Sequence, residues 1–314
     1  MSVGTAGGPA PGGPPGGPVR LTAAKVASPS FVTALVREGR VRPKRRLGQH
    51  FLVDRHVVER VVTCAAGDEG LGTTGVVEIG AGLGALTLAL AEAGASRVVA
   101  LEKDPDLVAI LVEAVAPWPG IEVVLGDALE FDLRRLVGTG LEPVVVGNLP
   151  YSVTTPLLLR LLEPPVFWSR AVVTVQLEVA ERILAFPGTK EYGSLTLAVQ
   201  AAARAEAVLR VPPHCFYPRP EVESTVLVLR RRGEPAGGLD PRGLRRLERV
   251  VRAAFGQRRK KVGNALAAGL RIPRDTAIAA LERAGLDPGR RGETLSLEEF
   301  VQLTRSLDGV WQGE

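Results

Sequence analysis

The chain has 314 residues, of which 46% are hydrophobic and 23% are charged, and its formal net charge is +5. This length allows one large domain with a full core and a smaller second domain. No apolar run could span a bilayer and no start resembles a signal peptide, which argues against membrane and exported proteins. Cys64 and Cys215 are far apart and no Cys/His cluster has metal-ligand spacing. We therefore expect reduced thiols, a cytoplasmic location and no metal.

The first forty residues are predicted to form a flexible tail and one short helix. Residues 1–20 contain 7 Gly and 5 Pro, and such a segment buries too little apolar surface to offset its ordering entropy. Residues 30–38 have the pattern of a capped helix. A basic stretch, 41–46, then leads into Gly48-Gln49-His50-Phe51-Leu52.

Residues 41–232 are predicted to be an α/β domain. Short β-branched runs at 76–79, 97–102, 121–127, 144–147 and 171–177 alternate with helical patterns such as 85–93 and 106–115. This alternation indicates a doubly wound parallel sheet. Two later runs, 207–211 and 225–230, flank a proline-rich stretch and predict a hairpin-like pair of strands at one sheet edge.

Residues 233–314 are predicted to be a small helical domain that begins with a linker at 233–238. Helical periodicity follows at about 240–255, 260–270, 275–285 and 296–307. Within 242–261, nine Lys or Arg residues accompany one acidic residue, Glu248. A solvated helix face usually interleaves both signs, so this excess favours a polyanion partner such as nucleic-acid phosphate over a merely soluble basic helix.

A glycine-rich loop, Glu78-Ile79-Gly80-Ala81-Gly82-Leu83-Gly84, ends the first predicted strand of the sheet. Glycines there let backbone N–H groups approach a ligand closely. The spacing departs from the dinucleotide fingerprint, and an acid two positions before the first glycine suits a cation such as S-adenosylmethionine better than a pyrophosphate. Glu102 and Asp127 end the next two strands and are expected to accept ribose hydroxyls and the adenine amine. Either acid alone could instead be a solvated strand end.

Asn148-Leu149-Pro150-Tyr151 follows the apolar run 144–146 and suits a flat amine. The Asn148 amide oxygen and the Leu149 carbonyl can accept both hydrogens of one exocyclic NH2, and the Tyr151 ring offers a stacking face. Pro150 helps to fix the direction of that carbonyl. Taken alone, the tetrapeptide could also be a strand end that closes into a turn.

Together these residues resemble the ribosomal RNA adenine N6,N6-dimethyltransferases of the KsgA (RsmA) type, from about Arg45 to the end of the chain. The matching motifs are 47–52, 78–87, 127–129, 148–151 with 155–156, 176–182, 187–193 and 216–224. The resemblance implies a Rossmann-like class I S-adenosylmethionine-dependent methyltransferase domain with a small all-helical C-terminal domain. It also implies that the targets are two adjacent adenosines in the 3′-terminal hairpin loop of 16S rRNA.

The resemblance also implies site residues. The positions that match the cofactor contacts of the family are His50, Leu52, Gly80, Glu102, Asp127 and Asn148, to which the loop adds Gly82. The family usually has Asn at the position of His50. Tyr151 and Phe216 would sandwich the unstacked adenine, although Phe216 could instead be a core residue beside prolines. The positions expected to bind rRNA phosphates are Arg258, Arg259, Lys260 and Lys261. We expect a monomer.

Three other functions remain open. Erm-type methyltransferases modify an adenine of 23S rRNA and share the glycine loop and a similar Asn-x-Pro-aromatic motif. Leu149, the stretch 255–261 and Arg291-x-Glu293-x-Leu295-Ser296 favour the KsgA type. A non-catalytic ribosome-assembly factor would keep the fold for docking alone, but the intact motif 148–151 argues against it. An oxidoreductase is the weakest alternative, because the glycine spacing does not suit nicotinamide.

Overall fold

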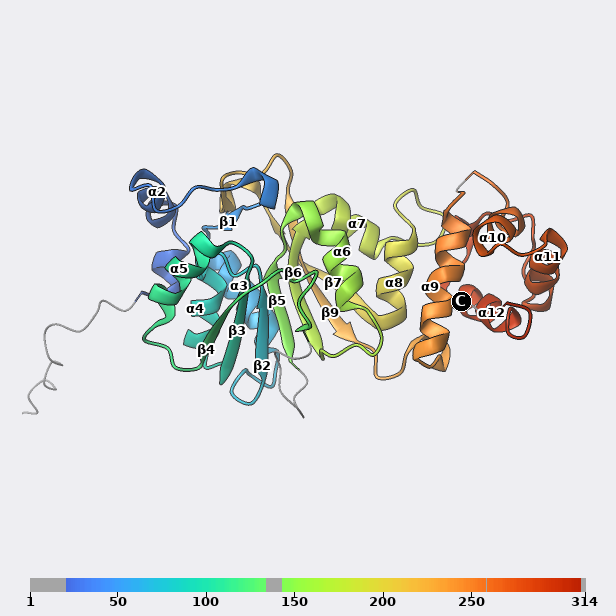
Figure 1. Cartoon of the computed structure of the whole chain (residues 1–314), viewed down its shortest axis with the longest axis horizontal. Coiled ribbons are helices and arrows are strands. Elements are labelled where there is room, and N and C mark those ends of the chain that lie inside the picture. The colour runs from blue at the N-terminus through green and yellow to red at the C-terminus, as the bar shows by residue number, and fades with distance from the viewer. Residues whose placement is uncertain (1–20, 134–142, 258, 312–314) are drawn as a thin grey trace, which may run out of the picture.

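A computed structural model describes residues 21–133, 143–257 and 259–311 (Figure 1). The predicted tail, 1–20, lies outside the described residues. The helices are α1 (Ala23–Val26), α2 (Pro29–Arg37), α3 (Arg55–Ala66), α4 (Ala85–Glu92), α5 (Pro105–Val115), α6 (Thr154–Leu161), α7 (Leu177–Leu184), α8 (Ser194–Ala202), α9 (Pro241–Phe255), α10 (Val262–Leu270), α11 (Arg274–Arg283) and α12 (Leu297–Ser306). The strands are β1 (Phe51–Leu52), β2 (Gly75–Ile79), β3 (Arg97–Glu102), β4 (Ile121–Leu125), β5 (Val144–Asn148), β6 (Arg170–Gln176), β7 (Ala203–Val211), β8 (Phe216–Tyr217) and β9 (Ser224–Arg231).

A seven-stranded sheet with the order β4-β3-β2-β5-β6-β9-β7 forms the centre of the protein. The strands from β4 to β6 run parallel, and β9 pairs antiparallel with both β6 and β7. β2 and β5 are neighbours in the sheet, but β3 continues from β2 toward one edge and β6 continues from β5 toward the other. Doubly wound folds place their ligand sites at the carboxyl ends of two such strands. The predicted sheet and its late edge pair are confirmed, although β7 begins at Ala203, four residues before the predicted 207.

Alternate residues of the central strands supply two hydrophobic cores, one on each face of the sheet. Val76 of β2 and Val144 of β5 pack with α3, α4 and α5. Their neighbours Val77 and Val145 pack on the other face with α6, α7 and α8. Successive side chains of a strand point to opposite faces, so a sheet covered on both sides needs apolar residues at consecutive positions. This requirement explains the unbroken β-branched runs in the sequence.

The segment before β1 packs against the sheet domain. Helix α2 confirms the predicted short helix, and α1 was not predicted from the sequence. Val26, Val32 and Leu35 are buried in the same core as α3 to α5. The backbone N–H of Ala23 also donates to Glu92 Oε1 of α4 at 3.0 Å. Helix α1 therefore packs against α4, the helix that follows the glycine loop.

The four predicted C-terminal helices are confirmed as α9 to α12, and they enclose a third core that includes Phe300. Figure 1 shows α9 standing beside α8, where the helical part meets the sheet domain. Tyr192 Oη donates to the Leu295 carbonyl at 2.7 Å across this contact. The predicted linker is held in place near its end, because Ala236 is buried and a Cβ on Gly237 would lie 2.4 Å from Val301 Cγ1.

The described residues include neither a membrane-spanning helix nor a cluster of metal-binding side chains. Within residues 21–133, 143–257 and 259–311, no helix combines the length and apolar character needed to cross a membrane. The same ranges hold no group of three or more His, Cys, Asp or Glu side chains placed to bind a metal ion.

Candidate functional site

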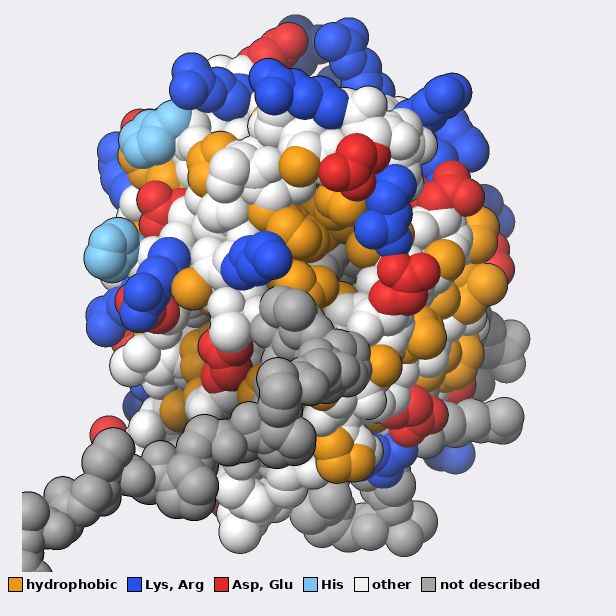
Figure 2. Space-filling view, turned by 90° about the vertical axis from the view of Figure 1, so that its left-hand side faces the viewer, with side chains coloured by type: hydrophobic (Ala, Val, Ile, Leu, Met, Phe, Trp, Pro, Cys, Tyr) orange, Lys and Arg blue, Asp and Glu red, His pale blue; other side chains and the backbone are white. Residues whose placement is uncertain are grey.

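A cavity opens at the carboxyl ends of β2, β3 and β5, with about 1190 Å³ of unfilled space including its mouth. Figure 2 shows a hollow with hydrophobic walls on the end face of the molecule, and Lys and Arg side chains gather along the upper edge of that face. The cavity brings together most residues predicted from separate motifs, namely His50, Leu52, Gly80, Gly82, Glu102, Asp127, Asn148, Leu149, Pro150 and Tyr151. Phe216 and the described residues of the basic segment 258–261 do not line it.

The glycine-rich loop lies directly against the Asn-Leu-Pro-Tyr motif. A Cβ atom added to Gly80 would lie 3.6 Å from the Asn148 carbonyl oxygen and 3.7 Å from Pro150 Cδ. Gly82 has φ +58°, a conformation that favours glycine, and its N–H donates to Glu102 Oε2 at 2.8 Å. The predicted cofactor loop and the predicted target motif are therefore adjacent walls of one cavity, as group transfer between two bound molecules requires.

Glu102 ends β3 as a buried acceptor, with 7% of its surface exposed. Its Oε1 accepts from Asp104 N at 2.9 Å and its Oε2 accepts from Gly82 N. Burial raises the pKa of Glu102, and these backbone N–H groups oppose that shift. Each carboxylate oxygen has a second lone pair, so Glu102 keeps the capacity to accept from ribose hydroxyls.

Asp127 follows β4 and also faces the cavity. Its Oδ1 accepts from Leu129 N at 2.9 Å and its Oδ2 accepts from Lys103 Nζ at 2.5 Å. Burial acts to raise the pKa of Asp127, but the hydrogen bonds from Lys103 and Leu129 outweigh it and hold the pKa below its ordinary value. Lys103 was not predicted as a site residue, because a single Lys after a strand carries no motif signal.

Glu78 is the most deeply buried acid of the cavity wall, with 1% of its surface exposed. Thr87 Oγ1 donates to Glu78 Oε2 at 2.6 Å. Burial raises the pKa of Glu78 to about 8, and the nearby charge of Glu102 adds to the shift. A group with this pKa changes its charge near neutral pH, and it is stabilised as a carboxylate when a cation lies close to it.

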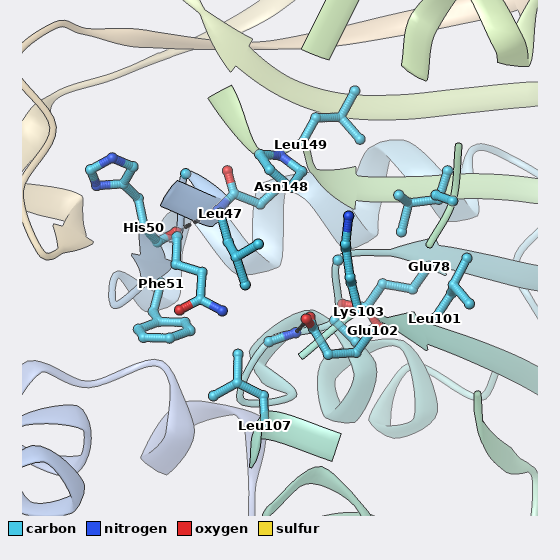
Figure 3. Close-up of a pocket in the computed structure, with 18 of the residues that line it drawn as sticks. Leu47, His50, Phe51, Glu78, Leu101, Glu102, Lys103, Leu107, Asn148 and Leu149 are labelled. Carbon is cyan, nitrogen blue, oxygen red and sulfur yellow. Dashed lines mark hydrogen bonds between the residues drawn. The ribbon is translucent and has the colours of Figure 1, made fainter. Parts of the chain in front are cut away.

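Asn148 presents an unpaired acceptor at the end of β5. Its Nδ2 donates to the backbone carbonyl of His50 at 2.7 Å (Figure 3). Its Oδ1 is buried and receives no hydrogen bond from the described part of the chain. Leaving such an acceptor unsatisfied costs about 1–3 kcal/mol. The oxygen is thus in the state expected of a group that accepts an N–H from a bound molecule.

Tyr151 is fixed at both its hydroxyl and its ring. The hydroxyl lies 2.5 Å from Ser224 Oγ, and burial raises its pKa. The ring stacks on the His50 imidazole, with centroids 4.9 Å apart and planes inclined by 28°. Phe216 lies in β8, pairs with Leu52 of β1, and exposes 1% of its surface. The structure therefore places Phe216 in the core, and the adenine sandwich with Tyr151 stays a prediction.

A strap formed by residues 44–52 lines one wall of the cavity through residues 46–52 and is clamped to the start of α5. Lys44 Nζ donates to Asp104 Oδ1 at 2.6 Å and to Asp106 Oδ2 at 2.8 Å. Gln49 Nε2 donates to Asp104 Oδ2 at 2.8 Å, and Asp104 is 2% exposed. Val26 of α1 also lines the cavity. Sequence reasoning missed these residues, since Asp104 has only the signal of a helix N-cap.

The basic segment lies between α9 and α10, apart from the cavity wall. Arg259, Lys260 and Lys261 are exposed, whereas Arg258 lies outside the described residues. On α9 itself, Arg242 and Arg245 are also exposed. The described cations of this segment are thus accessible to a polyanion.

Comparisons with known proteins agree over nearly the whole chain. The model of the ribosomal RNA adenine dimethylase family matches residues 40–308. The ribosomal RNA small subunit methyltransferase A of Moorella thermoacetica is 46% identical over 290 residues, which cover 90% of this chain and 98% of that protein. The protein of the same name from Alkaliphilus metalliredigens is 41% identical, with 90% and 98% covered.

Solved structures show the same architecture. The 23S rRNA methyltransferase ErmE is 31% identical, with a TM-score of 0.61 over 82% of this chain and 99% of that chain. A dimethyladenosine transferase from Plasmodium falciparum has a TM-score of 0.70 at 23% identity, over 82% and 98% of the two chains, and supports the fold. The predicted Rossmann-like methyltransferase fold with a helical C-terminal part is confirmed. Because the family model and these relatives span most of its length, the chain belongs to the ribosomal RNA adenine dimethylase family.

Proposed function

We propose that the enzyme transfers methyl groups from S-adenosylmethionine to N6 of two adjacent adenosines in the 3′-terminal hairpin loop of 16S rRNA. The product is N6,N6-dimethyladenosine, formed in the cytoplasm during biogenesis of the small ribosomal subunit. The observation that carries the proposal is the buried, unpaired Asn148 Oδ1 beside the glycine loop. An exocyclic amine of adenine supplies the N–H that this acceptor lacks.

The cavity wall suits S-adenosylmethionine. Gly80 and Gly82 let the backbone approach the cofactor closely. Glu102 and Asp127 supply acceptors for its ribose and adenine, and Glu78 supplies an acid that favours its positive charge. His50, Leu52 and Asn148 complete the set that matches the family. The bound cofactor supplies an electrophilic methyl group on its sulfonium.

The residues of the target motif would orient the amine. Asn148 Oδ1 and the Leu149 carbonyl accept its two N–H bonds, which aims the nitrogen lone pair into the cavity. Tyr151, whose hydroxyl is held by Ser224, offers a ring at a fixed position for the base. Transfer is then a direct in-line displacement governed by positioning, and no side chain forms a covalent intermediate. A strong base is unnecessary, because the amine proton becomes acidic only after the nitrogen is alkylated.

The helical part, residues 233–314, is proposed as the rRNA-binding domain, residues 41–232 as the catalytic domain, and residues 1–40 as the tail with its helices. We propose that the enzyme acts as a monomer on 16S rRNA within the small subunit. The basic segment 258–261 supplies affinity through phosphates, while the cavity selects the adenine.

Glu102→Ala is expected to weaken the binding of S-adenosylhomocysteine about 10- to 100-fold, because hydrogen bonds to a carboxylate contribute about 1.5–3 kcal/mol. Isothermal titration calorimetry measures the change. Glu113→Ala is the matched control, since Glu113 is an exposed acid of α5 paired with Arg40. Equal affinity for the Glu102 variant and the control would remove Glu102 from the cofactor site.

Replacing Arg258 and Arg259 together by Ala is expected to weaken rRNA binding and to reduce the slope of log K against log salt by about 2. Affinity for S-adenosylhomocysteine should stay unchanged. The control replaces Arg204 and Arg210, two exposed residues of β7. A parallel loss of cofactor affinity would mean that the segment has a structural role instead.

The substrate assignment is tested by methyl transfer from labelled S-adenosylmethionine to under-methylated small subunits and, in parallel, to protein-free 23S rRNA. Mass spectrometry identifies the modified nucleoside. We expect dimethyladenosine in the 3′-terminal loop of 16S rRNA. Labelling of 23S rRNA alone would support the Erm-type alternative. The reason to include this RNA is that the chain is 31% identical to the 23S rRNA methyltransferase ErmE. Labelling of neither RNA would favour a non-catalytic assembly factor.

A further inference from the structure

The strap touches the target motif as well as the cofactor loop, where a Cβ on Gly82 would lie 3.3 Å from Phe51 Cδ1. Gly48 has φ +63°, and a Cβ there would lie 3.1 Å from the backbone nitrogens of Tyr151 and Ser152. The His50 carbonyl accepts the Asn148 amide, as described above. The strap therefore lies directly on the loop that holds the target base, and its backbone sets which end of the Asn148 amide faces the cavity.

The His50 side chain contacts the target motif and the residue that follows β8. Its Nδ1 lies 2.7 Å from the Pro218 carbonyl oxygen, which requires the proton to be on Nδ1. Its ring stacks on Tyr151. Both hydrogen-bonding partners of the pair, Pro218 and Ser224, lie in or beside the segment from β8 to β9. The imidazole and the phenol thus form one fixed stack that joins the strap, the target motif and this segment.

We propose that His50 is a positioning residue for the target adenine, which acts by fixing the tilt of the Tyr151 ring. This inference rests on the proposed function. The family resemblance assigns position 50 to the cofactor, and we assign that contact to the His50 backbone, because its side chain contacts Tyr151 and Pro218. The Asn usual in the family could keep a hydrogen bond to Pro218 but has no ring to stack. His50 therefore gives this enzyme a stiffer wall beside N6.

The stiffness of this wall bears on the second methyl transfer. A once-methylated amine is bulkier and has one N–H left, so it is held by fewer hydrogen bonds than the first substrate. Its orientation then depends more on stacking against Tyr151. Loosening Tyr151 is expected to reduce the second transfer more than the first, so that monomethyladenosine accumulates.

The test compares His50→Asn, His50→Phe and His50→Ala with the control His56→Ala, whose side chain is 92% exposed on α3. Loss of an aromatic stack corresponds to about a 2- to 12-fold effect. We expect His50→Asn to raise KM for small subunits by that factor and to raise the monomethyl fraction, with Kd for S-adenosylhomocysteine within about twofold of wild type. His50→Phe, which keeps a ring, should recover most of the loss. His50→Ala should be the most impaired.

Two results would overturn the proposal. A rise in Kd for S-adenosylhomocysteine that matches the rise in KM would place the imidazole's role at the cofactor, and an unchanged His50→Asn enzyme would show that the stack has no role. Thermal melts check folding, and the Asn and Phe variants decide the question if the Ala variant does not fold. If the wild type methylates only 23S rRNA, the proposed function fails, and the same comparison on that RNA still tests His50.

Discussion

Asn148→Ala is expected to lower kcat for methyl transfer on the order of 100- to 1000-fold while the fold persists. The variant lacks the buried Oδ1 that orients the amine, so the nitrogen lone pair is no longer directed at the methyl group. It also leaves the His50 carbonyl without its donor, which costs about 1 kcal/mol of stability. Single-turnover labelling of small subunits at saturating S-adenosylmethionine measures the rate separately from cofactor binding.

Two further variants sharpen this experiment. Asn264→Ala is the matched control, because Asn264 is exposed on α10 and pairs only on the surface with Arg274. Asn148→Asp keeps an oxygen at the Oδ1 position but puts a second oxygen against the His50 carbonyl, so it should be nearly as inactive as the Ala variant. Loss of about 1.4 kcal/mol of transition-state stabilisation lowers a rate tenfold. A turnover of Asn148→Ala within about threefold of wild type would therefore contradict the proposed role of the amide.

The parts of the site that the sequence predicts are those fixed by strand ends. Glu102 and Asn148 each terminate a buried strand, and parallel strands bring their carboxyl ends to one edge of the sheet. Gly80 and Gly82 can be recognised from the sequence because the turn after the strand needs backbone conformations that favour glycine. Once the strands are recognised from their β-branched runs, the convergence of these residues follows from topology.

The parts that could not be predicted depend on contacts between distant segments. His50 and Pro218 are 168 positions apart, and Lys44 and Asp104 are 60 apart. No periodicity links such pairs, because tertiary packing alone decides which loops meet. Phe216 is a residue for which the sequence allows two positions, because an aromatic side chain beside prolines suits both a stacking site and the core. The structure places it in the core.

Glu78→Gln is expected to stabilise the cofactor-free protein at alkaline pH. Burial raises the pKa of Glu78 from 4.5 to about 8, so the folded protein keeps a proton that the unfolded chain loses in this range. The contribution of protonated Glu78 to the stability of the folded protein is therefore complete below pH 4.5, and it is lost as pH rises to about 8. The rise from 4.5 to about 8 corresponds to about 5 kcal/mol in the free energy of unfolding. Glutamine is neutral at every pH and can still accept from Thr87.

Urea unfolding at pH 5, 7 and 9 measures this difference, with Glu113→Gln as the exposed control. The variant should gain stability relative to wild type as pH rises from 5 to 9. Parallel stabilities across the range would show that Glu78 titrates normally.

Cofactor binding should respond in the opposite sense to the same substitution. A sulfonium or ammonium group stabilises the Glu78 carboxylate, so wild-type affinity for S-adenosylmethionine should rise as pH rises through about 8. The Gln variant should bind more weakly and without this pH dependence. Calorimetry in buffers of different ionisation enthalpy detects the proton released when the wild type binds below pH 8. The acid that lowers the stability of the free enzyme at alkaline pH is thus the group that favours the charged cofactor.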